Sequence, residues 1–205
     1  MKDTKVILVL GLGDREVPKF FIRWWKRWGL TIVLFQARWR SKEAYENKLA
    51  RLIELIDYES VKENISLIGT SAGGSLVINA FSKRKYKIIR VVGVCSRLRK
   101  GNLKGYSGFE QRTAGYDAFA ESVVSSEKNI KLLTTVDKLK IMTIKAWIDE
   151  LVPSNTSTID GVKNVILPSA EHMISIGLSL TLFSRSIREF LHQNKSETRA
   201  GVEPA

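Results

Sequence analysis

The sequence predicts an α/β protein: a three-layer α/β/α sandwich around a mostly parallel sheet of about six strands. Short apolar segments recur along the chain without polar alternation, as expected for strands buried on both faces. Segments of helical length and periodicity separate them, which favours a parallel sheet with helices on both sides. The 205 residues are enough chain for one domain with a substantial core.

The predicted strands are the apolar runs that end at glycines or polar residues. They span residues 5–10, 30–35, 65–68, 88–94, 139–146 and 164–167. The first run is closed by Gly11-Leu12-Gly13. In a parallel sheet, ligands bind where strands end at their carboxyl side, so the residues that follow these runs are the candidates for a site.

Helices are expected wherever apolar residues recur every three or four positions. The first, over 17–28, has an aromatic stripe that suits packing on a sheet better than membrane contact; it consists of Val17, Phe20, Phe21, Trp24, Trp25 and Trp28. Ser41 is expected to cap the second helix. Further helices are expected at residues 72–82, 116–125, 129–136 and 173–191.

Residues 96–115 contain four glycines and weak periodicity, which predicts a loop or small lid. We therefore expect one domain over residues 1–192, with a short lid-like insertion near 96–118. The segment 193–205 is polar and is expected to be a disordered tail.

Composition limits the functional classes. One cysteine excludes an internal disulfide, and two histidines argue against a histidine-rich metal site. No apolar stretch approaches the roughly 18 residues that span a bilayer. The N-terminal apolar run is followed at once by Asp14-Arg15-Glu16 without a cleavage pattern, so we expect a cytoplasmic protein. The basic residues behind the net charge of +12 are scattered along the chain, so no specific nucleic acid partner is expected, and nucleic-acid or membrane binding is only an alternative.

The segment ISLIGTSAGGSLVIN, residues 65–79, combines a strand, a tight turn and a helix. Its Gly69-x-Ser71-x-Gly73 pattern is that of a nucleophile elbow, in which a serine sits on a strained turn with its oxygen exposed. The neighbouring glycines let the strand and the helix approach each other.

Two phosphate-binding patterns fail. Gly11-x-Gly13 begins a dinucleotide fingerprint, but Glu16 occupies the position of its third glycine. The glycines around Ser71 have P-loop spacing, but Ser75 stands where the lysine belongs. No cofactor is therefore expected.

Two later segments complete a resemblance. Asp149-Glu150-Leu151-Val152-Pro153 follows the fifth predicted strand, and Glu171-His172-Met173 follows the sixth. With the elbow, these segments make residues 5–191 resemble a small single-domain α/β-hydrolase with a minimal cap. The order Ser71, Asp149, His172 is the order of that superfamily.

The resemblance implies that Ser71 is the nucleophile, His172 its base and Asp149 the acid that orients the base. The backbone N–H groups of Ala72 and Leu12 are expected to form the oxyanion hole, although Leu10-Gly11 replaces the family's common His-Gly dipeptide. Glu150 and the less suitable Asp137 remain alternative acids. Of the other candidates, Cys95 is expected to pack near the site and His192 to be solvated.

The resemblance implies a serine hydrolase, carboxylesterase-like, that acts on a small-molecule acyl substrate through an ester or thioester bond, without a metal or cofactor. A non-catalytic binding protein of the same fold, or a protein with a nucleic-acid- or membrane-binding surface, is the alternative. The basic residues of the lid segment are either solvated or recognise an anionic substrate group; they are Arg97, Arg99, Lys100 and Lys104. The sequence does not indicate an oligomeric state.

Overall fold

The computed structural model describes residues 4–13, 19–61 and 65–193. Within them the chain forms a six-stranded sheet in the order β2-β1-β3-β4-β5-β6, and every neighbouring pair is parallel. Each predicted strand overlaps one of the observed strands, so the predicted fold class is confirmed. The strands are β1 (Thr4–Val9), β2 (Leu30–Phe35), β3 (Ile65–Thr70), β4 (Ile88–Val94), β5 (Ile141–Ile148) and β6 (Lys163–Ala170).

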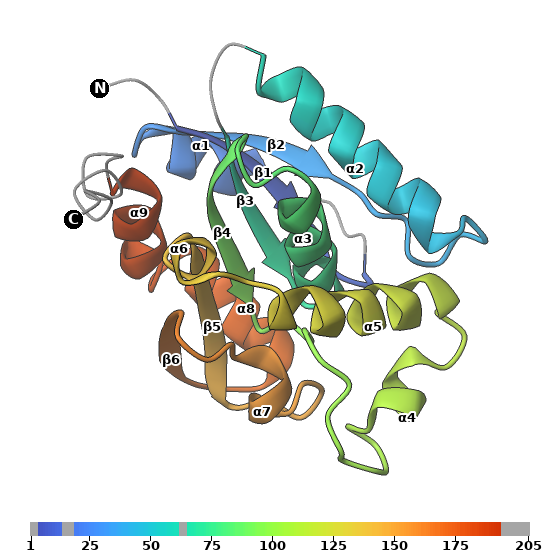
Figure 1. Ribbon diagram of the computed structural model, residues 1–205. Helices are drawn as coiled ribbons and strands as arrows, with labels where there is room; N and C mark the ends of the chain where they lie inside the picture. Colours follow the sequence, from blue (N-terminus) through green and yellow to red (C-terminus); the bar gives the residue numbers. More distant parts are fainter. Residues whose placement is uncertain (1–3, 14–18, 62–64, 194–205) are drawn as a thin grey trace, which may run out of the picture.

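Helices cover both faces of this sheet (Figure 1). On one face lie α2 (Tyr45–Glu59), α3 (Ala72–Lys83) and α5 (Asp117–Lys131), which also contact one another. On the other face lie α1 (Lys19–Lys26), α8 (His172–Leu180) and α9 (Arg185–His192). Short helices in the connections are α4 (Phe109–Thr113), α6 (Thr135–Lys138) and α7 (Ser154–Ser157).

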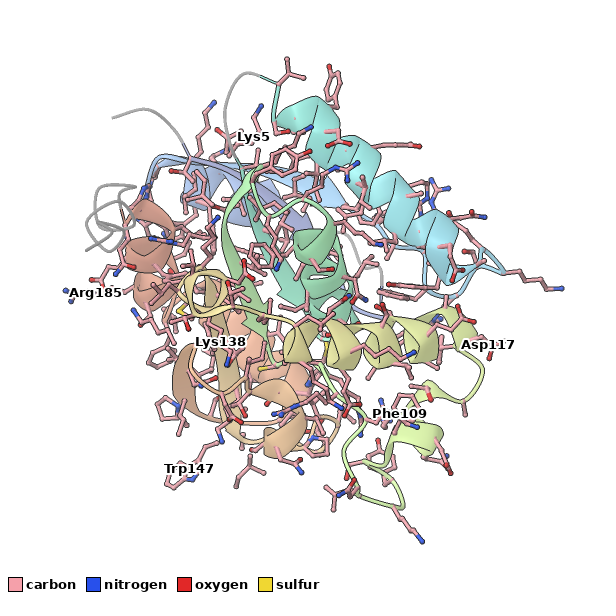
Figure 2. All side chains as sticks on the ribbon, viewed as in Figure 1. Lys5, Phe109, Asp117, Lys138, Trp147 and Arg185 are labelled. Atoms are coloured by element: carbon pink, nitrogen blue, oxygen red, sulfur yellow. The ribbon has the colours of Figure 1, made fainter. Side chains whose placement is uncertain are left out.

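The pleat of the strands divides the apolar side chains between two cores. In β1, Ile7 and Val9 belong to the core under α2, α3 and α5, and the alternating Val6 and Leu8 belong to the core under α1, α8 and α9. Side chains fill the space between the sheet and its helices (Figure 2). These two apolar layers bury both faces of the sheet, and the carboxyl ends of its strands carry the candidate site.

The aromatic stripe of the first helix packs on the sheet at Trp25, as expected. Trp25 is 1% exposed, and its indole N–H donates to the carbonyl of Leu180 at 2.7 Å. Trp24 is 39% exposed and stacks obliquely on Trp28. Val17 and the side chains of Phe20 and Phe21, the other members of the predicted stripe, lie outside the described part.

The predicted final helix over residues 173–191 is wrong, because two helices, α8 and α9, occupy this segment. Thr181 ends α8 with φ −120° and ψ −95°, outside the helical region. Its hydroxyl donates to the Gly177 carbonyl at 2.6 Å, and the Ser184 hydroxyl donates to the Thr181 carbonyl at 2.6 Å. Such local side-chain hydrogen bonds compete with the helical ladder and interrupt it here.

Two further helix predictions need correction. The helix expected to end near Ser125 continues to Lys131 as α5, and a separate helix over 129–136 does not form. Ser41 does not cap α2, which begins at Tyr45. The Ser41 hydroxyl instead donates to the Arg38 carbonyl and accepts a hydrogen bond from the buried ammonium of Lys48.

Over residues 96–118 the chain runs as an irregular loop, then α4, then the start of α5. A lid function for this segment stays a prediction. Of the expected tail over residues 193–205, only Gln193 belongs to the described residues, and it is exposed. In the portion of the chain that the structure describes, none of the helices has the length and apolar character needed to cross a membrane.

Candidate active site

Ser71 occupies the turn between β3 and α3, as the elbow pattern predicts. Its backbone has φ 50° and ψ −119°, a conformation that non-glycine residues rarely adopt and that costs about 1–3 kcal/mol. The Ser71 N–H donates to the Val94 carbonyl at 3.0 Å, so β4 holds the turn in place. A Cβ atom on Gly73 would lie 2.3 Å from the Val9 carbonyl oxygen, so only glycine lets α3 approach β1 this closely.

His172 is the first residue of α8 and follows the end of β6. Glu171, immediately before it, is held at φ 77°, and its carboxylate accepts the N–H groups of Met173 and Ile174 at 3.1 and 2.7 Å. These backbone hydrogen bonds lower the pKa of Glu171. The His172 N–H donates to the Glu150 carboxylate at 3.0 Å. Two carboxylates therefore anchor the backbone that carries the imidazole.

The register of the last two strands brings Asp149 to His172. Ile148, at the end of β5, pairs with Ala170, at the end of β6, so the residues that follow each strand lie side by side. Asp149 Oδ2 lies 2.8 Å from His172 Nδ1. Asp149 Oδ1 accepts the N–H groups of Leu151 and Val152 at 3.0 and 2.8 Å, which fixes the carboxylate from its other side.

The other ring nitrogen of His172 faces Ser71. Nε2 lies 2.9 Å from Ser71 Oγ, so a continuous hydrogen-bond chain joins Ser71, His172 and Asp149. The His172 and Asp149 side chains are 2% and 4% exposed. An ionised carboxylate at Nδ1 favours the imidazole tautomer whose Nε2 is free to accept a proton. This arrangement can withdraw the Ser71 proton when the oxygen attacks a substrate.

The alternative acids lie elsewhere. The Glu150 carboxylate accepts the backbone N–H of His172, and Asp149 is the carboxylate that lies beside the imidazole ring. Asp137 belongs to the capping box of α6 and pairs with Lys85 at 2.6 Å. The expectation that His192 is solvated is wrong, because this residue is half-buried and its Nε2 lies 2.9 Å from the Trp28 carbonyl.

The loop after β1 lies directly against Ser71. Val9 pairs with Gly69, and a Cβ atom on Gly11 would lie 2.8 Å from Ser71 Cβ. Leu12 and Ser71 line the same hollow. Ala72 begins α3, where the first N–H groups have no acceptor within the helix. The roles of Leu12 and Ala72 as oxyanion donors stay predictions.

Trp39 and Cys95 are buried residues near this end of the sheet. The Trp39 indole N–H donates to the Leu10 carbonyl at 3.1 Å, and its ring packs edge-on against Phe119. Cys95 is fully buried; burial, with a smaller contribution from the Asp149 charge, raises its pKa to about 12. Its thiol therefore stays protonated near neutral pH, consistent with a packing role near the site.

The hollow beside Ser71 is narrow, about 20 Å³, which is room for about one water molecule. Two arginines contribute to it, Arg97 and Arg112. Its apolar walls come from Leu12, Phe119, Leu151 and Val152. A larger hollow of about 580 Å³ lies between the 99–102 loop and residues near α7, and Ser71 does not line it. The hollow that matters for chemistry at Ser71 is therefore the small one.

The sequence pattern does not reveal several of these supporting residues. Trp39 reaches a carbonyl 29 positions away, and Glu150 reaches a backbone N–H 22 positions away. Arg97 lies in a glycine-rich segment that suggests solvent, yet it is 1% exposed. No local signal marks these contacts, because each depends on which strands become neighbours.

Comparison with known proteins identifies the fold. No family model matches the sequence, and no curated protein matches it. Solved structures do match. Est1E from Butyrivibrio proteoclasticus has a TM-score of 0.68 at 16% identity, covering 97% of this chain and 89% of that one. A monoacylglycerol lipase from Paleococcus ferrophilus has a TM-score of 0.65 at 16% identity, covering 93% and 96%. A lipase-esterase related protein from Clostridium acetobutylicum has a TM-score of 0.59 at 16% identity, covering 92% and 95%. The all-parallel six-stranded sheet and these neighbours show that the chain has the α/β-hydrolase fold.

Proposed function

We propose that this chain is a serine hydrolase that cleaves an ester or thioester through an acyl-enzyme on Ser71. The observation that carries the proposal is the hydrogen-bond chain from Ser71 Oγ through His172 to Asp149, with lengths of 2.9 and 2.8 Å. It begins on a strained turn of the kind that exposes a nucleophile. The lipase names of two neighbours of the same fold support ester chemistry.

In acylation, Ser71 Oγ forms a bond to the substrate carbonyl carbon while His172 Nε2 takes its proton. The carbonyl electron pair moves to the oxygen, which then accepts hydrogen bonds from the N–H groups of Leu12 and Ala72. The Asp149 carboxylate stabilises the imidazolium that forms. When the carbonyl re-forms, the bond to the leaving group breaks, and Nε2 returns the proton to the departing alcohol or thiol.

Deacylation repeats these steps with water. His172 Nε2 takes a proton from a water molecule as its oxygen attacks the acyl carbonyl. Collapse of the second tetrahedral intermediate breaks the bond to Ser71 Oγ, which regains its proton from Nε2. The balance is one ester or thioester and one water converted to one acid and one alcohol or thiol.

The test is covalent labelling with a neutral fluorophosphonate probe, followed by peptide mass spectrometry and assays on p-nitrophenyl esters. We expect the wild type to label at Ser71 and to hydrolyse the esters, and Ser71→Ala to do neither. Ser75→Ala, in the first turn of the helix that follows Ser71, is the matched control, because the Ser75 hydroxyl is buried and hydrogen-bonded to the Ala72 carbonyl and the Ser122 hydroxyl. That variant should label like the wild type.

Two outcomes contradict the proposal. A folded wild type that neither labels nor hydrolyses any ester would favour a non-catalytic binding protein. Labelling that persists in Ser71→Ala would assign the nucleophile to a different residue. Circular dichroism of each variant separates a lost nucleophile from a lost fold.

A further inference from the structure

Two arginines lie beside the nucleophile without an anionic partner. Arg97 and Arg112 line the same hollow as Ser71. Among the described residues, neither guanidinium has a carboxylate within ion-pair distance. The other walls of the hollow are apolar, so nothing within it offsets the two positive charges.

Arg97 is enclosed and only partly satisfied. Its side chain is 1% exposed, and its terminal nitrogens donate to the carbonyls of Ser107 and Lys100 at 2.9 and 3.0 Å. Its Nε is buried and has no hydrogen-bond partner. Burial lowers the pKa of Arg97 to about 10, which still leaves it charged at neutral pH. A buried cation without a counter-charge is costly to hold, so a bound anion would stabilise it.

Arg112 brings a second charge to the same place. It is a residue of α4, the short helix whose first residue, Phe109, is labelled in Figure 2. Its guanidinium stacks over the Tyr106 ring at 5.3 Å, is half-buried, and has no hydrogen bond or ion pair to a described residue. Both arginines border the same small hollow, and the charge of Arg112 adds to the effect of burial in lowering the pKa of Arg97. A group that binds both would relieve the repulsion between these two charges.

We infer that the substrate is an ester or thioester that carries a carboxylate within a few bonds of its scissile carbonyl, bound by Arg112 and Arg97 beside Ser71. This inference rests on the proposed hydrolase function and names its substrate class. Guanidinium groups bind carboxylates through paired, charge-assisted hydrogen bonds. These bonds are stronger among apolar walls than in water. The hollow of about 20 Å³ has room for about one water molecule, so a carboxylate fits only if the half-buried Arg112 side chain moves as it binds.

The test compares two matched pairs of substrates. The first pair, p-nitrophenyl hemisuccinate and p-nitrophenyl pentanoate, places the charge on the acyl side. The second pair, O-acetyl glycolate and propyl acetate, places it on the alcohol side. For at least one pair, we expect the kcat/KM of the wild type to be about tenfold or more higher for the anionic member. A single charge-assisted hydrogen bond is strong enough to produce a difference of this size.

Arg112→Gln is the main variant, because this side chain makes no hydrogen bond that the fold depends on. It should reduce the preference by about tenfold to a hundredfold, mainly through KM of the anionic substrate. Arg112→Lys keeps the charge without the paired geometry and should retain part of the preference. Lys104→Gln is the control: it removes a positive charge from an exposed lysine of the same segment and should leave the preference unchanged. The kinetics of Arg97→Gln are interpreted only if its thermal unfolding matches that of the wild type, because Arg97 also donates to the carbonyls of Lys100 and Ser107 and so holds this loop.

Three results would overturn the inference. If the wild type labels with the neutral fluorophosphonate but cleaves the neutral ester of each pair as well as the anionic one, only the inference fails. If Arg112→Gln lowers kcat/KM equally for both members of each pair, the arginine acts on the reaction in general and not on a substrate carboxylate. If the wild type neither labels nor cleaves any ester, the proposed function fails, and the inference fails with it.

Discussion

Replacing Asp149 with asparagine tests whether the carboxylate selects the tautomer of His172. The wild-type carboxylate uses both oxygens: Oδ2 faces His172 Nδ1, and Oδ1 accepts the N–H groups of Leu151 and Val152. Asparagine has one oxygen and one NH₂ group, so it can satisfy only one side. If its oxygen keeps the two backbone N–H groups, its NH₂ donates to Nδ1 and selects the tautomer with the proton on Nε2. In that tautomer His172 cannot accept the Ser71 proton.

The opposite orientation of the amide, with its oxygen toward His172 Nδ1, restores the tautomer whose Nε2 can accept a proton, but it costs hydrogen bonds to the backbone. Turning the amide would aim its NH₂ at two backbone donors and break two hydrogen bonds in a nearly closed site. At roughly 1–2 kcal/mol each, the cost is about 2–4 kcal/mol. Since about 1.4 kcal/mol is a factor of ten, the productive orientation is populated about one time in thirty to one in a thousand. We therefore expect Asp149→Asn to lower kcat/KM by about thirtyfold to a thousandfold, with little change in fold.

The assay is the hydrolysis of p-nitrophenyl acetate together with the rate of fluorophosphonate labelling. Glu150→Gln is the matched control: its amide oxygen can still accept the His172 N–H, so its kcat/KM should stay within a few-fold of the wild type. If Asp149→Asn keeps near wild-type kcat/KM while Glu150→Gln loses it, the acid has been assigned to the wrong carboxylate. Thermal unfolding of both variants shows whether the loss arises from misfolding.

Three further predictions concern the scaffold. Gly73→Ala should destabilise the fold by roughly 1–3 kcal/mol, because its Cβ would clash with the Val9 carbonyl. Gly177→Ala in α8 is the control, because the added Cβ would meet no neighbouring atom within 4 Å outside its own helix backbone, so the substitution should be neutral or stabilising. Urea titrations measure both variants, and an equal loss of unfolding free energy in the two would contradict the packing argument. Trp39→Phe should lower kcat several-fold and stability by about 1 kcal/mol, because the Leu10 carbonyl loses the indole donor; an unchanged kcat would mean that this bond does not position the loop. Hydrogen bonds from Arg84, and to a smaller extent from Lys87, lower the pKa of Asp57 from 3.8 to about 2. The contribution of these hydrogen bonds to the free energy of unfolding is therefore complete above about pH 4 and is lost as the pH falls toward 2. With the side chain 34% exposed, Asp57→Asn should cost about 1 kcal/mol at pH 7, and urea titrations should show the difference narrowing below pH 4; a difference independent of pH would refute this.

The helices show where local patterns mislead. The sequence predicts a helix that ends near Ser125, yet α5 continues to Lys131, because α3 packs against it. Asn129 donates to the Asn79 side chain at 2.9 Å, and Asn79 donates to the Ser122 carbonyl at 2.9 Å. Over residues 173–191 the apolar pattern predicts one helix where the structure has two, because the hydroxyls of Thr181 and Ser184 donate to nearby carbonyls and interrupt the helix. Periodicity finds an apolar face but does not show these polar contacts.

The sequence by itself determined the parallel sheet, the elbow at Ser71 and the chain positions of Asp149 and His172. It could do so because buried strands and a strand–turn–helix are encoded by neighbouring residues, and because the residues after parallel strands meet on one rim. Only the tertiary structure decided which of two adjacent carboxylates faces the imidazole, since that depends on the β5–β6 register. It also decided that Arg97, in a segment composed like a solvated loop, is enclosed beside Ser71. Burial is set by what the rest of the chain places around a residue, and the residues next to it in sequence do not carry that information.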